Sequence, residues 1–439
     1  MAKKRFLVDA SVYLRAPYAL QAFEENVVFL PDTVLSDMEK YTHQPGEFRA
    51  NAIEFFQLLE KLIDKNGSEP EIGSGGKLVF INAKGKNIYQ LSNEYNATIV
   101  SRDPAVRVQA KAHLLSAEGF KAETAPNEHL LYSGRCYLYI SDKEMAEFAS
   151  KKSLRLNPNI PYMAVDETGT MISDDYHLTL NEYIVLLNSS HPESGSQLGR
   201  FNGQTIEPLI YTKQTPVFGV TARNVGQMFA LDALLDPNTP LVMLLGPAGT
   251  GKSFLAMAMA LQKTLEEERY KHILVSRPNT KMDNDIGYLK GDESEKVLPV
   301  LRGLMDNIDN LISGKKTIPG ASPVDYLMET GVLKPQAMAY MRGRSIMDQF
   351  IIMDEMQNAT PIQALSIVTR IGEGSKLVLM GDPDQIDNPY LDRQSNGLVY
   401  AAERMRGSPY CRQVTFLEKE STRSPLAKDA LSRLRPKGY

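Results

Sequence analysis

A glycine-rich stretch between two apolar segments carries the clearest chemistry of this sequence. Residues 241–255 read LVMLLGPAGTGKSFL, which is a predicted strand, the spacing G-x-x-x-x-G-K-S and a predicted helix. The backbone N–H groups of such a loop can surround a polyphosphate, and the following helix places its positive end at the same anion. We expect Lys252 to reach the terminal phosphates and Ser253 to bind magnesium. The predicted nucleotide-binding residues of this loop are Gly246, Pro247, Ala248, Gly249, Thr250, Gly251, Lys252 and Ser253.

Further residues suited to phosphate chemistry follow downstream. Two carboxylates end the apolar stretch FIIMDE at 350–355, so Asp354 is expected to hold magnesium through water and Glu355 to act as general base on the attacking water. The next predicted strand runs into GDPDQ, which places Gln385 to contact the γ-phosphate or the attacking water. Arg423, one of several arginines near the C-terminus, has a guanidinium that suits the charge of a transferring phosphoryl group.

The motifs GPAGTGKS, DEMQNAT, GEGSKLVLMGDPDQID and ESTRSPLA occur in this order and together resemble the PhoH family of P-loop ATPases, which are related to superfamily-one helicases. The resemblance covers roughly residues 217–435. It implies a RecA-like domain that binds ATP and magnesium, in which Asn224 and Gln227 contact the adenine and Gln385 senses the γ-phosphate. It further implies a homo-oligomeric ring, a hexamer, in which Arg423 completes the site of a neighbouring subunit.

A second set of carboxylates lies near the N-terminus. Two predicted strands run into aspartates, in FLVD at 6–9 and in TIVSRD at 98–103, and Asp37 follows the predicted strand 27–31. The carboxyl ends of parallel strands share one edge of a sheet, so Asp9, Asp37 and Asp103 can meet there. Magnesium or manganese held by them would activate water for phosphodiester hydrolysis. Aspartate also caps helices and begins turns, so the spacing alone leaves a structural role open.

The same two N-terminal motifs resemble the PIN domain, a metal-dependent ribonuclease fold that is often fused to PhoH domains. The resemblance covers roughly residues 4–123 and implies that the three aspartates bind the metal ion, with Ser11 as a supporting hydroxyl. This family usually carries an acid before the next predicted helix, where this sequence has Lys86 and Asn87. The departure leaves open a catalytically weak or inactive PIN domain that serves as an RNA-binding or assembly module.

Strands and helices alternate in both halves of the chain, which predicts α/β domains with parallel sheets covered on both faces. We predict a PIN-like domain at 1–127, a β-rich connector at 128–215 and a PhoH-like P-loop domain at 216–439. A helix over 49–63 is expected to turn Ile53, Phe56, Leu59 and Ile63 inward. The connector, with short alternating runs between Asn, Gly, Pro and Ser clusters, is predicted to be a passive spacer, with a nucleic-acid platform as the alternative.

The composition is that of a soluble globular protein, with 43% hydrophobic and 23% charged residues in 439. No apolar run approaches the roughly 18 residues that a membrane-spanning helix needs, so we expect no membrane partner. Cys136 and Cys411 lie far apart without metal-ligand spacing, which is typical of reduced thiols in a cytoplasmic protein. The net charge of −4 argues against bulk coating of nucleic acid but allows a local basic channel.

These observations predict an ATP-dependent RNA helicase or translocase joined to a PIN-type ribonuclease that acts on single-stranded or partly duplex RNA. The first alternative keeps the ATPase and makes the N-terminal domain non-catalytic. A second alternative is a nucleotide-dependent switch without translocation.

Overall fold

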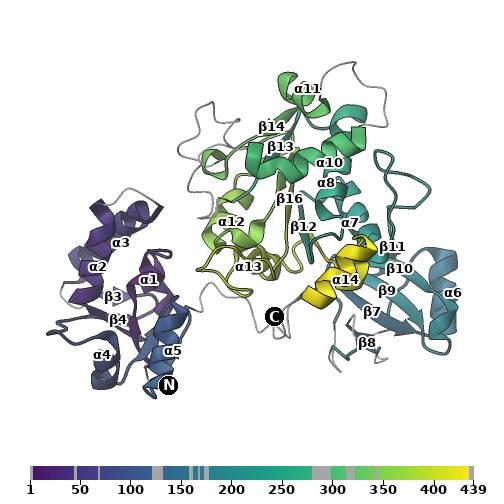
Figure 1. The fold of residues 1–439 in the computed structure, drawn as a ribbon. Helices are drawn as coiled ribbons and strands as arrows, with labels where there is room; N and C mark the ends of the chain where they lie inside the picture. The colour runs from purple at the N-terminus through teal and green to yellow at the C-terminus, as the bar shows by residue number, and fades with distance from the viewer. Residues whose placement is uncertain are drawn as a thin grey trace. The chain divides into compact units, whose positions relative to one another are not determined.

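The computed structural model divides into two compact units, Met1–Thr124 and Ala125–Tyr439 (Figure 1). The predicted boundary at 127/128 lies outside the described residues. The connector and the P-loop domain, which we predicted as separate domains, lie together in the second unit. The structure describes residues 3–43, 47–67, 70–120, 132–157, 162–166, 169–172, 177–278, 298–312, 322–341 and 345–434.

The first unit is built on a six-stranded sheet in the order β3-β4-β2-β1-β5-β6. All neighbours pair in parallel except β3 and β4 at one edge. The strands are β1 (Arg5–Val8), β2 (Val27–Pro31), β3 (Glu71–Ile72), β4 (Gly76–Ile81), β5 (Thr98–Val100) and β6 (Ala117–Glu118). The helices are α1 (Ala10–Tyr13), η1 (Ala19–Phe23), α2 (Asp32–His43), α3 (Glu47–Asn66), α4 (Ile88–Tyr95) and α5 (Pro104–Ala112).

Both faces of this sheet are covered because successive residues of each strand point to opposite sides. In β1, Val8 packs into the core that α1 and α3 close, whereas Leu7 packs into the core that α4 and α5 close. In β2, Leu30 and Phe29 are divided in the same way. The predicted parallel α/β architecture is therefore confirmed in this unit.

The second unit contains a five-stranded mixed sheet in the order β11-β10-β9-β7-β8. Its elements are β7 (Arg135–Ile140), α6 (Asp142–Lys151), β8 (Ala164–Val165), β9 (Tyr183–Asn188), η4 (Pro192–Ser194), β10 (Ser196–Phe201) and β11 (Ile206–Pro208). We call this part the β-rich domain. One face packs on Phe148 of α6, and the other contributes Tyr183 and Val185 to the core of the P-loop domain.

The rest of the second unit is a six-stranded, all-parallel sheet in the order β14-β13-β15-β16-β12-β17. Its strands are β12 (Leu241–Leu245), β13 (His272–Ser276), β14 (Leu333–Pro335), β15 (Gln349–Met353), β16 (Lys376–Gly381) and β17 (Cys411–Thr415). Helices α7 (Val225–Leu235), α8 (Lys252–Leu261), α10 (Arg302–Ile312) and α11 (Pro323–Glu329) share one core, and α12 (Pro361–Val368) and α13 (Gly397–Arg404) lie over the other face. The remaining elements are the π-helical turn η5 (Gln262–Glu266), the short helices η8 (Leu298–Leu301), η9 (Met338–Met341), η10 (Met356–Asn358) and η11 (Glu418–Glu420), and α14 (Pro425–Leu434).

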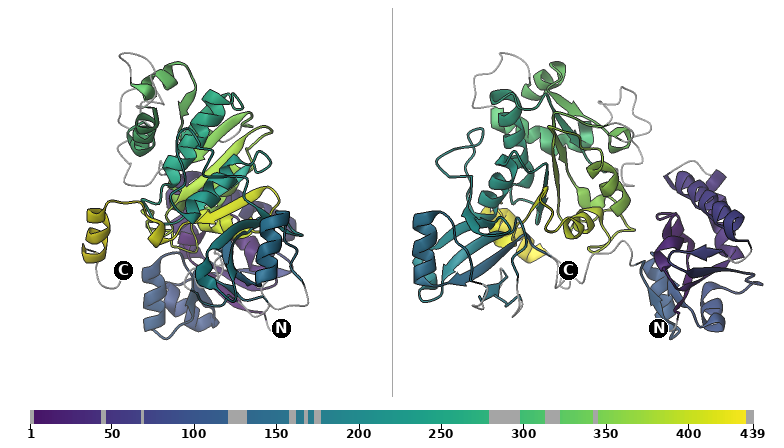
Figure 2. Two further views of the ribbon diagram at one scale, coloured as in Figure 1. Left: turned by 90° about the vertical axis from the view of Figure 1, so that its right-hand side faces the viewer. Right: turned by 180° about the vertical axis from the view of Figure 1, so that it is seen from behind.

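The β-rich domain is attached to the P-loop domain by buried contacts rather than by a linker alone. Tyr183 stacks on Phe229 of α7 with ring centroids 4.6 Å apart, and its hydroxyl donates to Asp232. The backbone N–H of Thr415, at the end of β17, donates to the carbonyl of Ser133 just before β7. The two sheets of this unit lie against each other in the views of Figure 2. Each face of the five-stranded sheet contributes buried side chains to a core, and the nucleic-acid platform that we gave as the alternative stays a prediction.

No helix in the described parts of the chain is long and apolar enough to cross a membrane. Both cysteines, Cys136 and Cys411, are buried free thiols.

Candidate nucleotide-binding site

The predicted phosphate motifs meet at one edge of the six-stranded sheet. Strand β16 lies between β12 and β15, and all three run in parallel, so their carboxyl ends point the same way. The loop after β12 is the P-loop, Asp354 follows β15, and Asp382 follows β16. In open parallel sheets, ligands bind at this edge.

The P-loop is held closed by its own lysine. Lys252 is 7% exposed, and its Nζ donates to the carbonyl oxygens of Gly246 at 2.6 Å and Pro247 at 3.0 Å. Burial lowers the pKa of Lys252, and the negative charges of Asp382, Asp354 and Glu355 oppose that shift. The ammonium therefore sits where phosphate oxygens would compete for it.

Ser253 and Asp354, which we predict to hold magnesium, lie next to each other. The Ser253 hydroxyl lies 3.5 Å from Oδ2 of Asp354. Burial and the charge of Glu355 raise the pKa of Asp354 to about 6. A partly buried carboxylate with a raised pKa, lying beside a hydroxyl, is a donor set that suits a hard divalent cation, because the cation stabilises the ionised form. These residues fit magnesium.

Glu355 is held in an unusual backbone conformation at the end of this strand. Its φ is +54°, the left-handed region that non-glycine residues rarely adopt, and its N–H donates to Oδ1 of Asp354 at 3.0 Å. The Gln357 amide donates to the Glu355 carboxylate. Strain of this kind is common at sites where a side chain must be aimed.

Asp382 and Gln357, which we did not predict as site residues, join the loops that follow β12, β15 and β16. Oδ2 of Asp382 accepts the backbone N–H of Ala248 at 3.0 Å and the amide of Gln385 at 2.8 Å. Gln357, which is 0% exposed, donates to the Gln385 carbonyl at 2.9 Å and accepts the Asp382 N–H at 3.2 Å. Asp382 could have been found by the signal that identified Asp354, since each carboxylate directly follows a strand with a long apolar run.

Asn224 and Gln227 lie beside the P-loop, at the start of α7. The Asn224 side chain caps this helix by accepting the Gln227 N–H at 2.9 Å. The Gln227 amide donates to the Thr250 carbonyl at 2.9 Å and accepts the Arg223 N–H at 2.9 Å. These contacts attach α7 to the tip of the P-loop, and the adenine contact that the resemblance implies stays a prediction.

Arg423 lies against the P-loop of its own chain. A Cβ atom added to Gly249 would lie only 2.4 Å from Cγ of Arg423, so the side chain packs directly on the loop. The neighbouring Thr422 donates its N–H and its hydroxyl to the Gly249 carbonyl at 2.8 and 3.0 Å. The structure thus gives Arg423 a position in cis, whereas its role in a neighbouring subunit of a ring stays a prediction.

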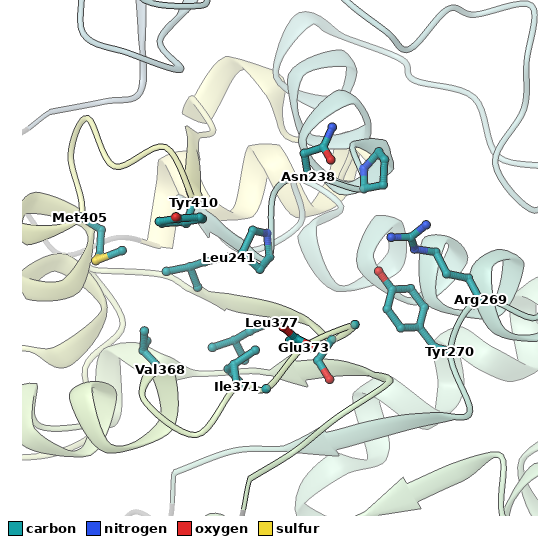
Figure 3. A pocket seen from close by; sticks show the side chains of 15 residues that line it. Asn238, Leu241, Arg269, Tyr270, Val368, Ile371, Glu373, Leu377, Met405 and Tyr410 are labelled. Carbon is teal, nitrogen blue, oxygen red and sulfur yellow. The ribbon is translucent and has the colours of Figure 1, made fainter.

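A cavity of about 570 Å³ lies at the opposite edge of the sheet, where the strands begin (Figure 3). Its wall includes Leu241, the first residue of β12, and Leu377, the second residue of β16. Arg269, Tyr270 and Tyr410 also line it. None of the predicted site residues lines it. The residues that we predict to bind nucleotide therefore lie at the carboxyl edge of the sheet and not at this cavity.

The N-terminal aspartates are only partly brought together. Oδ2 of Asp9 accepts the hydroxyls of Ser11 and of Ser101, the latter at 2.9 Å. The Ser101 hydroxyl in turn accepts the N–H of Asp103 at 3.1 Å, and Asp103 caps α5. Because β1 and β5 are parallel neighbours, Asp9 and Asp103 lie at one edge, as the sequence predicts.

Asp37 is placed elsewhere. It pairs with Lys40 at 2.7 Å on the exposed surface of α2, six residues after the end of β2. The carboxylate that directly follows β2 is Asp32, and it accepts the Ala83 N–H at 2.9 Å. Among the described residues, no group of three or more His, Cys, Asp or Glu is arranged to hold a metal ion. The expected three-aspartate cluster is therefore not formed in this structure.

Lys86 and Asn87, which replace the expected acid, have structural partners. Lys86 pairs with Glu94 at 2.7 Å, and Asn87 caps α4 in a reciprocal pair with Gln90. The charge of Lys86 is thus balanced within its own helix–loop segment.

Comparison with known proteins places the chain among relatives that match along its whole length. The PhoH-like protein family model matches residues 219–434. Protein PhoH2 of Bacillus subtilis is 34% identical over 98% of this chain and 100% of its own length, and Protein PhoH2 of Mycolicibacterium smegmatis is 28% identical over 97% and 95%. Among solved structures, the Pif1 helicase from Candida albicans matches over 48% of this chain and 43% of its own, with 15% identity and a TM-score of 0.25. The full-length relative and the family model over the nucleotide site together make this chain a member of the PhoH family.

Proposed function

We propose that this chain is an ATPase that moves or unwinds RNA and that its N-terminal unit is a metal-dependent ribonuclease. The observation that carries the ATPase is the meeting of the P-loop, Asp354, Glu355 and Asp382 at one edge of a parallel sheet. Membership of the PhoH family supports nucleotide hydrolysis and a P-loop core. The preference for RNA, the cleavage of RNA and the hexameric ring belong to the proposal.

Binding of ATP would replace contacts that the loop now makes with itself. The Lys252 ammonium is bound to the Gly246 and Pro247 carbonyls, and the Ala248 N–H is bound to the Asp382 carboxylate. Phosphate oxygens accept both kinds of donor, with charge-assisted hydrogen bonds. The Asp382 carboxylate would then lose its hydrogen bond from the Ala248 N–H. If it also released the side-chain amide of Gln385, that amide could contact the γ-phosphate.

Hydrolysis would use the acids at the end of β15. Ser253 and Asp354 would hold magnesium, which supplies neutralising charge on the phosphates. Glu355 would take the proton from the attacking water as the general base. The Gln357 amide fixes the Glu355 carboxylate and, through Gln385, ties it to the γ-phosphate sensor.

Stimulation by RNA tests the proposal directly. We expect phosphate release from ATP to rise several-fold when single-stranded RNA is added at low salt. The stimulation should fall as salt is raised, because contacts of Lys and Arg with RNA phosphates release counterions. Single-stranded DNA of the same sequence is the matched control for the preference for RNA. Turnover that ignores both polymers would favour a nucleotide-dependent switch, and the absence of turnover would contradict the ATPase.

The nuclease part is tested at Asp9. We expect Asp9→Asn to abolish magnesium- or manganese-dependent cleavage of single-stranded RNA, because Asp9 is the carboxylate that Ser11 and Ser101 both orient. Gel analysis of end-labelled RNA measures the cleavage. Asp37→Asn is the informative companion: equal loss would show that Asp37 leaves Lys40 to join the site.

A second candidate function is favoured by the pairing of Asp37 with Lys40 and by the missing three-acid group among the described residues. In this alternative the N-terminal unit binds RNA or assists assembly without cutting. Equal cleavage by the wild type and Asp9→Asn, with unchanged affinity for RNA, would favour it over the nuclease.

A further inference from the structure

Glu420 is a buried carboxylate at which three segments of the second unit meet. It is 7% exposed, and its two oxygens accept the two terminal guanidinium nitrogens of Arg135, each at 2.9 Å. The same oxygens accept the backbone N–H groups of Gly226 at 2.8 Å and Leu417 at 2.9 Å. Arg135 belongs to β7 of the β-rich domain and Gly226 to α7, so one carboxylate joins the β-rich domain to the nucleotide site.

One route leads from Glu420 to the P-loop through α7. The Glu420 carbonyl accepts the side-chain amide of Asn224 at 2.9 Å, and Asn224 caps α7. Gln227, in the first turn of this helix, holds the Thr250 carbonyl at the tip of the P-loop. A shift of Glu420 would therefore move the start of α7 and, with it, a contact of the loop.

A second route runs along the chain. Thr422, two residues after Glu420, holds the Gly249 carbonyl through its N–H and its hydroxyl. Arg423 then packs on Gly249 itself. The segment from Glu420 to Arg423 is thus a strap, anchored at Arg135 and lying across the P-loop.

The side chains along the strap pack closely on two glycines. A Cβ atom added to Gly226 would lie 2.5 Å from Oε2 of Glu420, and one added to Gly249 would lie 2.4 Å from Cγ of Arg423. Real Cβ atoms do not approach heavy atoms so closely, so a larger residue at either glycine would displace the side chain of Glu420 or of Arg423. Close packing of this kind transmits a displacement instead of absorbing it.

We propose that Arg135 is a positioning residue for the nucleotide site and that the β-rich domain is a working part of the ATPase rather than a spacer. Side chains of Arg135 and Glu420 are 1% and 7% exposed, so removing the guanidinium would leave an uncompensated charge in the interior. Glu420 would then move toward water and release Gly226, and the strap would lose its anchor. The inference rests on the proposed ATP hydrolysis only for its turnover readout, because nucleotide affinity reports the same geometry independently.

The experiment compares full-length Arg135→Met, Arg135→Lys and Phe148→Leu with the wild type. Met keeps the apolar stem of Arg135 without its charge, and Lys keeps a charge without the two-pronged hydrogen bond. Phe148 is 3% exposed and packs on the face of the β-rich sheet that is turned away from the P-loop domain, so Phe148→Leu is the control for lost stability alone. The measurements are the melting temperature, KM and kcat for ATP, and the Kd of magnesium–ADP by calorimetry.

We expect Arg135→Met to raise KM and the ADP Kd by about 10-fold, which corresponds to about 1.4 kcal/mol, and Arg135→Lys to recover part of that loss. Phe148→Leu should lower the melting temperature while keeping both constants near the wild-type values. Wild-type constants in Arg135→Met would overturn the inference. If Arg135→Met does not fold, a weaker ADP affinity of Arg135→Lys than of Phe148→Leu supports the inference, and equal affinity overturns it. A wild type that binds ADP without hydrolysing ATP contradicts the proposed function, and the ADP affinities still decide the role of Arg135.

Discussion

Replacing Glu355 with glutamine should lower ATP turnover by about 10²- to 10⁴-fold, the range that a positioned general base contributes. Glutamine keeps the shape and the hydrogen-bonding oxygen of Glu355 but cannot accept a proton from water. The left-handed backbone at this residue and its contact with Asp354 are unchanged by the substitution, so the magnesium–ADP affinity should stay near the wild-type value. Steady-state phosphate release and calorimetry measure the two quantities.

Glu373→Gln is the matched control for this prediction. Glu373 is an exposed carboxylate at the cavity at the opposite edge of the same sheet, so the same chemical change there should leave turnover intact. If Glu355→Gln kept more than a tenth of wild-type turnover, Glu355 would not be the base. An equal loss in Glu373→Gln would mean that the sheet, and not the site, had been disturbed.

Replacing Arg412 with methionine should lower the free energy of unfolding of the full chain by about 3–5 kcal/mol, the usual cost of removing one partner from a buried ion pair. Arg412 lies on β17, is 2% exposed and donates to Asp232 at 3.1 Å and to Asp236. Burial raises the pKa of Asp232, and the charge of Arg412 opposes that rise. Without Arg412, two carboxylates would stay in the interior with no guanidinium between them.

Arg433→Met removes an arginine whose ion pair is exposed. Its partner is Asp429, one helical turn away on α14, and both side chains are more than half exposed. Such pairs contribute at most about 1 kcal/mol, so the unfolding free energy should barely change. Denaturant unfolding followed by circular dichroism separates the two variants, and a loss below about 1 kcal/mol for Arg412→Met would contradict the prediction.

Local patterns predicted the parts of the molecule in which one segment determines its own structure. The P-loop, the strand before Asp354 and the strand before Gln385 are read from runs of apolar residues that end in glycine or acid. The parallel sheets followed from the alternation of such strands with helices. These features depend on neighbours in the sequence, so they can be recognised without the fold.

Features that depend on distant partners could not be predicted in this way. The hydrogen bonds between Arg135 and Glu420 join residues 285 positions apart, and no local sequence pattern around either residue predicts the pairing. Asp37 comes after β2, as the three-aspartate prediction required, but its carboxylate forms an ion pair with Lys40, one turn along the same helix. The connector was expected to be passive because its own sequence carries no chemical motif.

Which side of an amphipathic helix faces the core also depends on the elements that pack against it. In α3 the structure buries Ala52, Phe55 and Leu59, whereas Ile53 and Ile63, which we expected to face inward, are 37% and 38% exposed. A rotation of about 100° separates adjacent helix residues, so a stripe that is partly apolar on both sides can face the core either way. The packing of α3 against α1 and α2 decides which side is buried.

The burial of Arg135 and Tyr183 against the P-loop domain also determines where this chain can be divided. A fragment that began at residue 216 would contain Glu420 without the guanidinium of Arg135, and Asp232 without the hydroxyl of Tyr183. It would expose the apolar surface on which Phe229 now meets that ring. A fragment that is made to study the P-loop domain should therefore begin before Tyr132, so that it keeps the five-stranded sheet.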